Sequence, residues 1–337
     1  MIGAFASSAF ASAVAPGCSR PAAPVPEKER KFHPGHYVTF GNAKGENVFS
    51  DALAPGVAGI EMRYRWAELE PREGQYDLSL VARDLDLVRR SDRQLVVLIE
   101  DKTFKDEMPT PAYLAKYTLP NRNRGYSALR WDPYVNGRLE KLVEQIGAQF
   151  DCDPHFEGVA FQETAPGLED SDLDAHGYSA EAYRDALIDL LRSASASVPR
   201  SRVFWYMNFL PRGQQYIGDV AEAVLGRGVV MGGPDILPDN PVLAQKVYPF
   251  YEKFRGRMPL FNSMQHNSYR HRHRDSGGRR GDYWSMEDLY GFARDRLHVD
   301  YVFWDYHNRR QPSDSHDFGD AREVIMRHPT INSGNPH

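Results

Sequence analysis

Acidic side chains follow several short apolar runs of this 337-residue chain. Glu163 stands between the apolar run that ends at Phe161 and Thr164. Burial at such a position favours the protonated form of a carboxyl group, which can then donate a proton near neutral pH. The pattern therefore indicates general acid–base chemistry. The acidic residues that follow other apolar runs are Asp235, Asp305, Glu100 and Asp101.

These residues lie in a chain in which short β-branched or aromatic runs alternate with segments of helical period. The alternation is typical of βα units on a parallel sheet. Eight strands are predicted, at residues 36–41, 59–66, 94–100, 158–163, 202–208, 228–232, 258–264 and 300–304. Helices are predicted at residues 78–90, 134–150, 180–197, 217–225, 241–254 and 286–296, with a brief last segment at 320–326.

Eight alternations without a break in composition between residues 31 and 326 favour a single α/β domain, a closed (β/α)8 TIM barrel. A doubly wound open sheet is the alternative, but no glycine-rich phosphate-binding motif follows the first strand. In a barrel, the chemistry lies at the carboxyl ends of the strands, where the acidic residues are expected. The predicted domain covers residues 31–330, and residues 331–337 are predicted to form a disordered tail.

The segment from residue 63 to residue 77 carries the most specific motif. It consists of RYRWAELEPREGQYD, with an Arg on the strand, then Trp, a Glu-Pro turn, Gly and Tyr-Asp. This motif resembles the second βα segment of the clan of glycoside hydrolase (β/α)8 barrels. The resemblance implies that Gln162-Glu163 corresponds to the Asn-Glu pair of that clan, with Glu163 as the general acid/base. It also implies that Trp304 is the aromatic floor under the sugar.

The second carboxylate is missing from the place that the resemblance implies. The seventh predicted strand carries Gln265 where the clan has its nucleophilic Glu, and an amide cannot form the glycosyl ester. Asp235 is the first substitute, followed by Asp305 and then by Glu100 or Asp101. When the two carboxyl groups are about 6.5–9.5 Å apart, a water molecule fits between one of them and the sugar, and the anomeric configuration is inverted. A separation of about 5–5.5 Å allows a carboxylate to attack the anomeric carbon directly. The missing nucleophile favours inversion.

Other residues near the strand ends are candidates for substrate binding. Arg63 and Arg65 share one face of a strand, where one of them orients a catalytic carboxylate or pairs for structure only. Asn208 bonds a sugar hydroxyl or caps its strand. Aromatic residues at strand ends can stack on sugar rings. The predicted substrate-binding set is Arg63, Arg65, Glu100, Asn208, Gln265, Tyr269 and Trp304.

The segment after the seventh strand holds His266, His271 and His273, with arginines interleaved. The arginines repel a cation, and the His-Glu-x-x-His spacing of a zinc site does not occur, so no metal is expected. No cofactor is predicted either. The segment is predicted to be a long loop that overhangs the cleft and contacts acidic or hydroxylated sugars, or a solvated loop of no special function.

The composition is that of a globular protein, with 41% hydrophobic and 26% charged residues. A net charge of −5 argues against a nucleic-acid binder. Residues 1–30 are predicted to be a signal-like or lipobox-like segment with a Pro/Ala-rich tether. This segment predicts export to the periplasm, the outer membrane or the medium, with Cys18 as the candidate for a lipid anchor. A disordered tail without a targeting role is the alternative.

The sequence thus predicts an exported bacterial glycosidase-like enzyme that cleaves a polysaccharide or oligosaccharide with Glu163 as general acid. A carbohydrate-binding barrel without catalysis is the alternative, in which Gln265 marks the loss of the nucleophile. A polysaccharide lyase, in which an Arg and a base act, is a third hypothesis. A second carboxyl group near Glu163 across an open cleft would favour hydrolysis.

Overall fold

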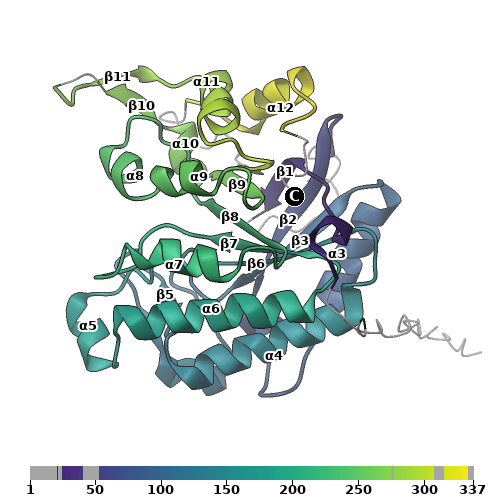
Figure 1. The fold of residues 1–337 in the computed structure, drawn as a ribbon, viewed down its shortest axis with the longest axis vertical. Helices are drawn as coiled ribbons and strands as arrows, with labels where there is room; N and C mark the ends of the chain where they lie inside the picture. The colour runs from purple at the N-terminus through teal and green to yellow at the C-terminus, as the bar shows by residue number, and fades with distance from the viewer. Residues whose placement is uncertain (1–20, 22–24, 41–52, 275–276, 307–314, 333–337) are drawn as a thin grey trace, which may run out of the picture.

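The computed structural model describes residues 21, 25–40, 53–274, 277–306 and 315–332, which form a closed barrel of parallel strands (Figure 1). This architecture confirms the predicted single (β/α)8 TIM barrel. Around the barrel the strands are β1 (Gly35–Phe40), β12 (Tyr301–Asp305), β9 (Leu260–Met264), β8 (Val229–Gly233), β7 (Arg202–Tyr206), β6 (Phe156–Phe161), β3 (Gln94–Glu100) and β2 (Val57–Arg65). The ring closes because β2 pairs with β1.

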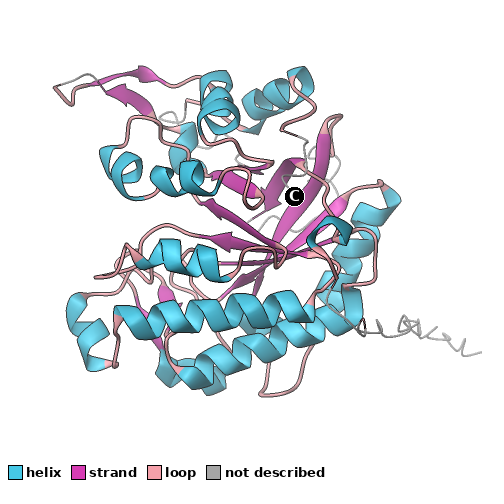
Figure 2. Cartoon of the chain, viewed as in Figure 1, coloured by secondary structure: helices cyan, strands magenta, loops and turns pink. Residues whose placement is uncertain are grey.

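Helices cover the outside of the barrel (Figure 2). In α4, the apolar residues that recur at helical spacing are buried against the sheet, and Asp132 caps the first turn by accepting from the amides of Tyr134 and Val135. The longer helices are α3 (Ser79–Arg90), α4 (Pro133–Phe150), α6 (Ala180–Ser197), α7 (Tyr216–Ala223), α8 (Pro241–Lys246), α9 (Tyr248–Phe254), α11 (Met286–Gly291) and α12 (Phe318–Arg327). A further helix of six residues is α5 (Asp170–Ala175), and the remaining segments are η1 (Glu27–Glu29), α2 (Trp66–Leu69), η2 (Ala112–Tyr117), α10 (His266–Tyr269) and the π turn η3 (Phe292–Arg296).

Two predicted helices differ from the observed ones. The helix predicted at 241–254 is divided into α8 and α9, with Val247 between them. Pro249 lies in the first turn of α9, and proline has no amide hydrogen to continue a preceding helix and clashes with its last turn. The helix predicted at 286–296 starts as α11 and continues as the π turn η3, with Ser285 as its side-chain cap.

The inside of the barrel is filled mainly by aromatic and aliphatic side chains. Successive residues of a strand point to opposite faces, so each strand contributes alternate residues to this inner core and the others to the layer under the helices. The inner core comprises Tyr37, Val96, Leu98, Ala160, Phe204, Tyr206, Val230, Phe261, Tyr301 and Phe303. A strand residue therefore reaches the open end of the barrel only if its side chain is one of the alternate ones that point inward.

Two antiparallel hairpins extend the carboxyl end of the barrel. β4 (Thr118–Pro120) and β5 (Tyr126–Ala128) follow β3. β10 (Arg272–Arg274) and β11 (Arg280–Tyr283) follow β9. The segment predicted as a long loop after the seventh strand is therefore the short helix α10 and a hairpin, because cross-strand pairing satisfies its backbone.

The amino-terminal segment is described only in part. The predicted lipid-anchor residue Cys18 lies outside the described residues, so export and lipidation stay predictions. Arg30, at the end of the predicted tether, is buried and donates to the carbonyl oxygens of Val198 and Ser201. None of the described helices combines the length and the hydropathy that a membrane span needs.

Part of the predicted carboxyl-terminal tail packs on the barrel. Ile331 is buried. The Asn332 amide donates to the carbonyl oxygens of Arg294 and Val299, at 3.1 and 3.0 Å. Residues 333–337 of this tail lie outside the described residues.

Candidate active site

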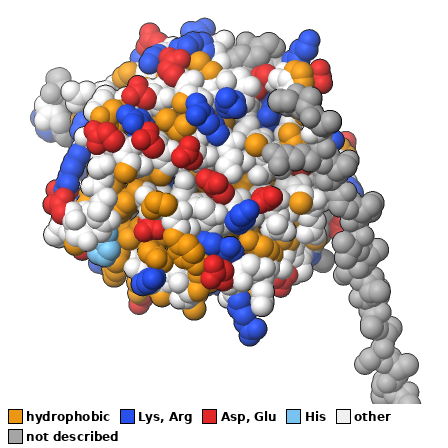
Figure 3. All heavy atoms as spheres, turned by 60° about the horizontal axis from the view of Figure 1, so that its bottom comes forward, with side chains coloured by type: hydrophobic (Ala, Val, Ile, Leu, Met, Phe, Trp, Pro, Cys, Tyr) orange, Lys and Arg blue, Asp and Glu red, His pale blue; other side chains and the backbone are white. Residues whose placement is uncertain are grey.

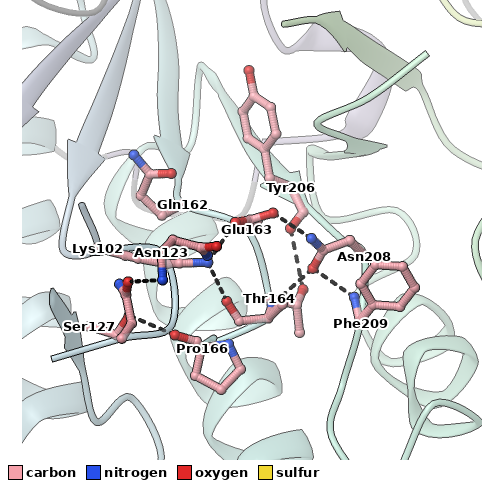
Figure 4. Close-up of polar contacts among 12 residues, drawn as sticks. Lys102, Asn123, Ser127, Gln162, Glu163, Thr164, Pro166, Tyr206, Asn208 and Phe209 are labelled. Carbon is pink, nitrogen blue, oxygen red and sulfur yellow. Dashed lines mark hydrogen bonds and ion pairs between the residues drawn. The ribbon is translucent and has the colours of Figure 1, made fainter. Parts of the chain in front are cut away.

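Glu163 follows the carboxyl end of β6, and both of its carboxylate oxygens accept hydrogen bonds (Figure 4). The Lys102 ammonium lies 2.5 Å from Oε1, and the Asn208 amide lies 2.5 Å from Oε2. The Glu163 side chain is 15% exposed, so solvent reaches it while these two donors fix its position. Both contacts come from side chains that donate, so the Glu163 carboxylate oxygens serve as acceptors in this arrangement.

Lys102 comes two residues after the end of β3 and is almost fully buried. Besides Glu163, its ammonium donates to the carbonyl oxygen of Ala165 at 2.7 Å and lies 4.7 Å from the centre of the Phe104 ring. Burial lowers the pKa of Lys102, and the charge of Glu163 opposes that shift. Lys102 therefore has three partners that hold it beside Glu163.

The backbone under Glu163 is held by a buried ion pair. Arg130 donates to both carboxylate oxygens of Asp101, with Nη2 at 2.7 Å from Oδ1. Its Nη1 donates to the carbonyl oxygens of Gln162 and Glu163, at 2.9 and 3.0 Å. A bidentate pair of this kind fixes the geometry as well as the charge. Arg130 thus fixes the end of β6 from which the Glu163 side chain projects.

Asn208 fixes the carboxylate from the neighbouring strand. Its Oδ1 accepts from the amides of Ala165 and Phe209, at 2.8 and 2.6 Å, while its amide nitrogen donates to Glu163. The sequence analysis expected a bond from Asn208 to a sugar hydroxyl or a strand cap. The observed contacts make it a positioning residue for Glu163.

Asp235 supplies a second carboxyl group, in the loop after β8. Burial raises the pKa of Asp235 to about 7, the charge of Glu163 adds to the rise, and a hydrogen bond with the Asn267 side chain opposes it. The buried Oδ1 of Asp235 has no hydrogen-bond partner within the described part of the chain. Below pH 7 this carboxyl group is therefore mainly protonated.

Arg63 lies on the inward face of β2, among carboxylates. Burial opposes its charge, but the charges of Asp305, Glu61 and Glu100 outweigh burial and raise the pKa of Arg63. Burial raises the pKa of Glu61 and of Glu100, and the Arg63 charge opposes both shifts. Glu61 also accepts from the hydroxyl of Tyr206 at 2.8 Å. Arg63 therefore balances the charges of these acidic groups, and its expected role of orienting a catalytic carboxylate stays a prediction.

Arg65 is the last residue of β2, and its charge acts on Glu100 of this cluster. Its guanidinium forms ion pairs with Glu68, at 3.1 Å, and with Glu107. The backbone amide of Arg65 also donates to the Glu68 carboxylate, at 3.0 Å, in the cap of α2. The ion pairs of Arg65 therefore involve Glu68 and Glu107, outside the inner core.

A hollow of about 250 Å³, which includes space open to solvent, lies at this end of the barrel. Gln265, at the end of β9, lines it together with Glu163. The lining residues are Arg63, Leu98, Phe104, Gln162, Glu163, Tyr206, Pro234 and Gln265.

Trp304 does not face this hollow, which corrects its expected role as an aromatic floor. Phe303 belongs to the inner core, and Trp304 therefore points outward between β12 and the helices. Its indole is fully buried, donates to Nδ1 of His36 at 3.0 Å and stacks on Tyr290. A fully buried indole on the outer face cannot contact a sugar in the barrel mouth.

Tyr269 is also unsuited to its expected role as a sugar platform. The side chain is fully buried in α10, and its hydroxyl donates to the carbonyl oxygen of Asp305 at 2.9 Å. Asp305 itself lies at the end of β12, where its charge acts on Arg63. The structure therefore places Asp305 with the arginine cluster and uses Tyr269 to hold the end of that strand.

Three polar residues of the site were not predicted from the sequence. Lys102 directly follows the acidic pair Glu100-Asp101 after a buried strand, so its position carried a usable signal. Arg130 lies in a loop far along the chain, and Glu61 lies inside a strand, where a charged residue is usually unexpected. Among the described residues, no three His, Cys, Asp or Glu side chains are grouped as metal ligands.

No family model and no curated protein matches this sequence. Solved structures do match, and they include several glycosidases. The beta-galactosidase from Bacillus circulans sp. alkalophilus matches 89% of this chain with a TM-score of 0.57 and 12% identity. A variant of the endo-beta-1,4-glucanase from Xanthomonas axonopodis pv. citri matches 88% with a TM-score of 0.56 and 11% identity. Endo-glycoceramidase II from Rhodococcus sp. matches 90% with a TM-score of 0.54 and 10% identity.

The shares of the matched chains differ widely. This chain covers 56% of the galactosidase, 80% of the glycoceramidase and 100% of the glucanase. It spans about half the length of the galactosidase, so that protein contains regions with no counterpart here. At these identities the likeness is one of fold, and the chain has the TIM-barrel fold found in these glycoside hydrolases.

Proposed function

We propose that this protein is a glycoside hydrolase that cleaves a polysaccharide or oligosaccharide. The proposal depends on one observation: Glu163, held between Lys102 and Asn208, lines a solvent-open hollow together with Pro234, and its charge acts on the carboxyl group of the adjacent Asp235. Glycoside cleavage needs one protonated and one ionised carboxyl group on either side of the scissile bond. The fold shared with glycosidases supports the same conclusion.

The contacts favour a division of roles that differs from the one expected from the sequence. Glu163 is paired with a cation, while the pKa of Asp235 is raised to about 7. Two carboxyl groups whose environments differ in this way take opposite roles. We therefore assign proton donation to the glycosidic oxygen to Asp235. Glu163 serves the anomeric carbon, either directly or by taking a proton from the attacking water.

Gln265 supports a second candidate function, carbohydrate binding without cleavage. It lines the hollow with an amide, at the place where the family resemblance implies a nucleophilic carboxylate. An amide there can donate and accept hydrogen bonds but cannot form a covalent intermediate. A protein that binds sugars through this hollow and releases no product would fit this candidate.

Release of reducing ends tests the proposal directly. The named activities of the matched structures concern beta-1,4-mannoside, galactoside and glucan substrates. We expect purified protein to release reducing ends from at least one soluble mannan, galactan, glucan or acidic polysaccharide. The anomeric form of the first product, observed by NMR, then separates inversion from retention. Absence of release from every polymer, combined with measurable binding, would favour the second candidate.

Replacing Lys102 by Met tests the assigned role of Glu163. Loss of the ammonium removes the cation that favours the ionised carboxylate, so the acidic limb of the pH–rate profile should move to higher pH. At the optimum we expect kcat to fall about 10–100-fold, because Glu163 also loses a positioning contact. Lys102→Arg should recover part of the rate, and Lys116→Met, at an exposed lysine of η2, is the control. An acidic limb that stays in place would contradict the role given to Lys102.

A further inference from the structure

The β10–β11 hairpin carries an unusual concentration of positive charge. Residues 270–284 contain five arginines and two aspartates, in a chain whose net charge is −5. The hairpin projects from the body of the molecule beside α8 and α10 (Figure 1). On the face shown in Figure 3, acidic and basic side chains are interspersed instead. The positive charge of the hairpin is therefore a local feature.

One side of the hairpin is anchored to the loop that contains Asp235. Asp239, four residues further along this loop, accepts hydrogen bonds from the His271 ring, from the amide of Arg274 at 2.6 Å and from the Trp284 indole at 3.4 Å. The Trp284 ring also stacks on His273 at 4.0 Å. These contacts attach the hairpin to the loop that follows β8 and contains Asp235.

Two arginines of the hairpin lie opposite each other in an arrangement that their contacts with described residues do not explain. Arg274 and Arg280 are cross-strand partners, and both are exposed. Neither side chain has an ion-pair partner in the described part of the chain. Arg272 stacks on Tyr283, with its guanidinium 3.8 Å from the ring centre. Like charges directly opposite each other destabilise a strand pair, and a bound anion would offset that repulsion.

We infer that the arginine pair Arg274–Arg280, with Arg272 stacked on Tyr283 beside it, binds the carboxylate groups of an acidic polysaccharide. This inference rests on the proposed function, because it names the substrate class of the same site. The planar guanidinium matches a carboxylate bidentately, and aromatic rings offer sugars a stacking surface. A chain held by the hairpin would extend toward the loop of Asp235.

Calorimetric binding to a polygalacturonate oligomer tests the inference. The measurements use the full chain with Glu163→Gln, so that no ligand is consumed. We expect binding that weakens as salt is added, and a loss of about tenfold in the double variant R274Q/R280Q. The double variant K28Q/R90Q removes the same charge from exposed positions in η1 and α3 and should bind as the parent does. The fully methyl-esterified oligomer should also bind about tenfold more weakly, because it has lost its charges.

Several results would overturn the inference. These are no binding of polygalacturonate, equal binding of the esterified oligomer, equal losses in the two double variants, or equally tight binding of single-stranded DNA. Failure of this inference can be told apart from failure of the proposed function. A wild-type protein that cleaves a neutral glycan but does not bind polygalacturonate refutes only the inference. One that binds polygalacturonate through the hairpin and cleaves nothing refutes only the hydrolase function.

Discussion

Replacing Glu163 by Gln should lower kcat for glycosidic cleavage by roughly 10²–10⁴-fold, the usual contribution of a positioned acid or base. Glutamine keeps the shape of the side chain but can neither take a proton from water nor attack the anomeric carbon. Lys102 and Asn208 each donate a hydrogen bond to one oxygen of Glu163. In the glutamine variant one of these oxygens becomes an NH2 group, which cannot accept, so one of the two donors loses its hydrogen bond. The free energy of unfolding should therefore fall as well, by about 1–3 kcal/mol.

The control for this variant is Glu169→Gln, at an exposed glutamate at the start of α5. Steady-state kinetics and calorimetric binding are measured on both proteins with the same oligosaccharide. We expect Glu163→Gln to retain ligand affinity within a few-fold, so that the loss is confined to turnover. If Glu163→Gln turns over at the wild-type rate, Glu163 has no part in the mechanism.

Replacing Asp235 by Asn should have opposite effects on activity and on stability. The proposed proton donor is lost, so kcat should fall by roughly 10²–10⁴-fold for substrates whose leaving group needs protonation. Substrates with a leaving group that needs no proton should lose much less. Such a split between substrates identifies Asp235 as the acid, since loss of the base would slow both kinds alike.

The stability change follows from the raised pKa of Asp235. The folded protein keeps this proton up to about pH 7, whereas the unfolded chain loses it near the ordinary value of 3.8. Between these values the folded state binds more protons, so the stability that depends on this group falls as the pH rises through that range. Asn does not titrate, so the variant should become more stable than the wild type, by roughly 2–4 kcal/mol above pH 7.

Urea unfolding at several pH values checks this sign. The stability difference between Asp235→Asn and the wild type should be close to zero near pH 3 and should reach its maximum above pH 7. Asp219→Asn, at an exposed aspartate of α7, is the control and should show no such trend. A variant that is less stable than the wild type at pH 8 would contradict a buried, proton-retaining Asp235.

The strand pattern alone predicted much of the fold, because the signals involved are local. Short β-branched runs and the apolar face of α4 depend on residues a few positions apart, and each is visible in the sequence. The break at Pro249 was equally local, and it was missed although proline has a known effect on a helix. The position of Glu163 at the end of a buried strand was predicted in the same way.

The protonation states of the site depended on contacts that no local pattern contains. Lys102 comes from the end of β3, Asn208 from the end of β7 and Asp235 from the loop after β8. Only closure of the barrel brings Lys102 and Asn208 to the two carboxylate oxygens of Glu163, and the pKa of Asp235 is raised by its burial and by the charge of Glu163. The roles of the two carboxyl groups were therefore decided by the tertiary structure.

Trp304 shows that a position at the end of a strand is not enough to predict the role of a side chain. The sequence correctly placed it on the last strand, but a shift of one residue moves a side chain from one face of a strand to the other. Phe303 faces the inner core, so Trp304 faces the helices. The sequence by itself determined the eight strands, their order along the chain and a carboxylate at the end of one of them. Only the tertiary structure decided which side chains reach the mouth and which of them are charged, because both depend on registers and distances between strands far apart in sequence.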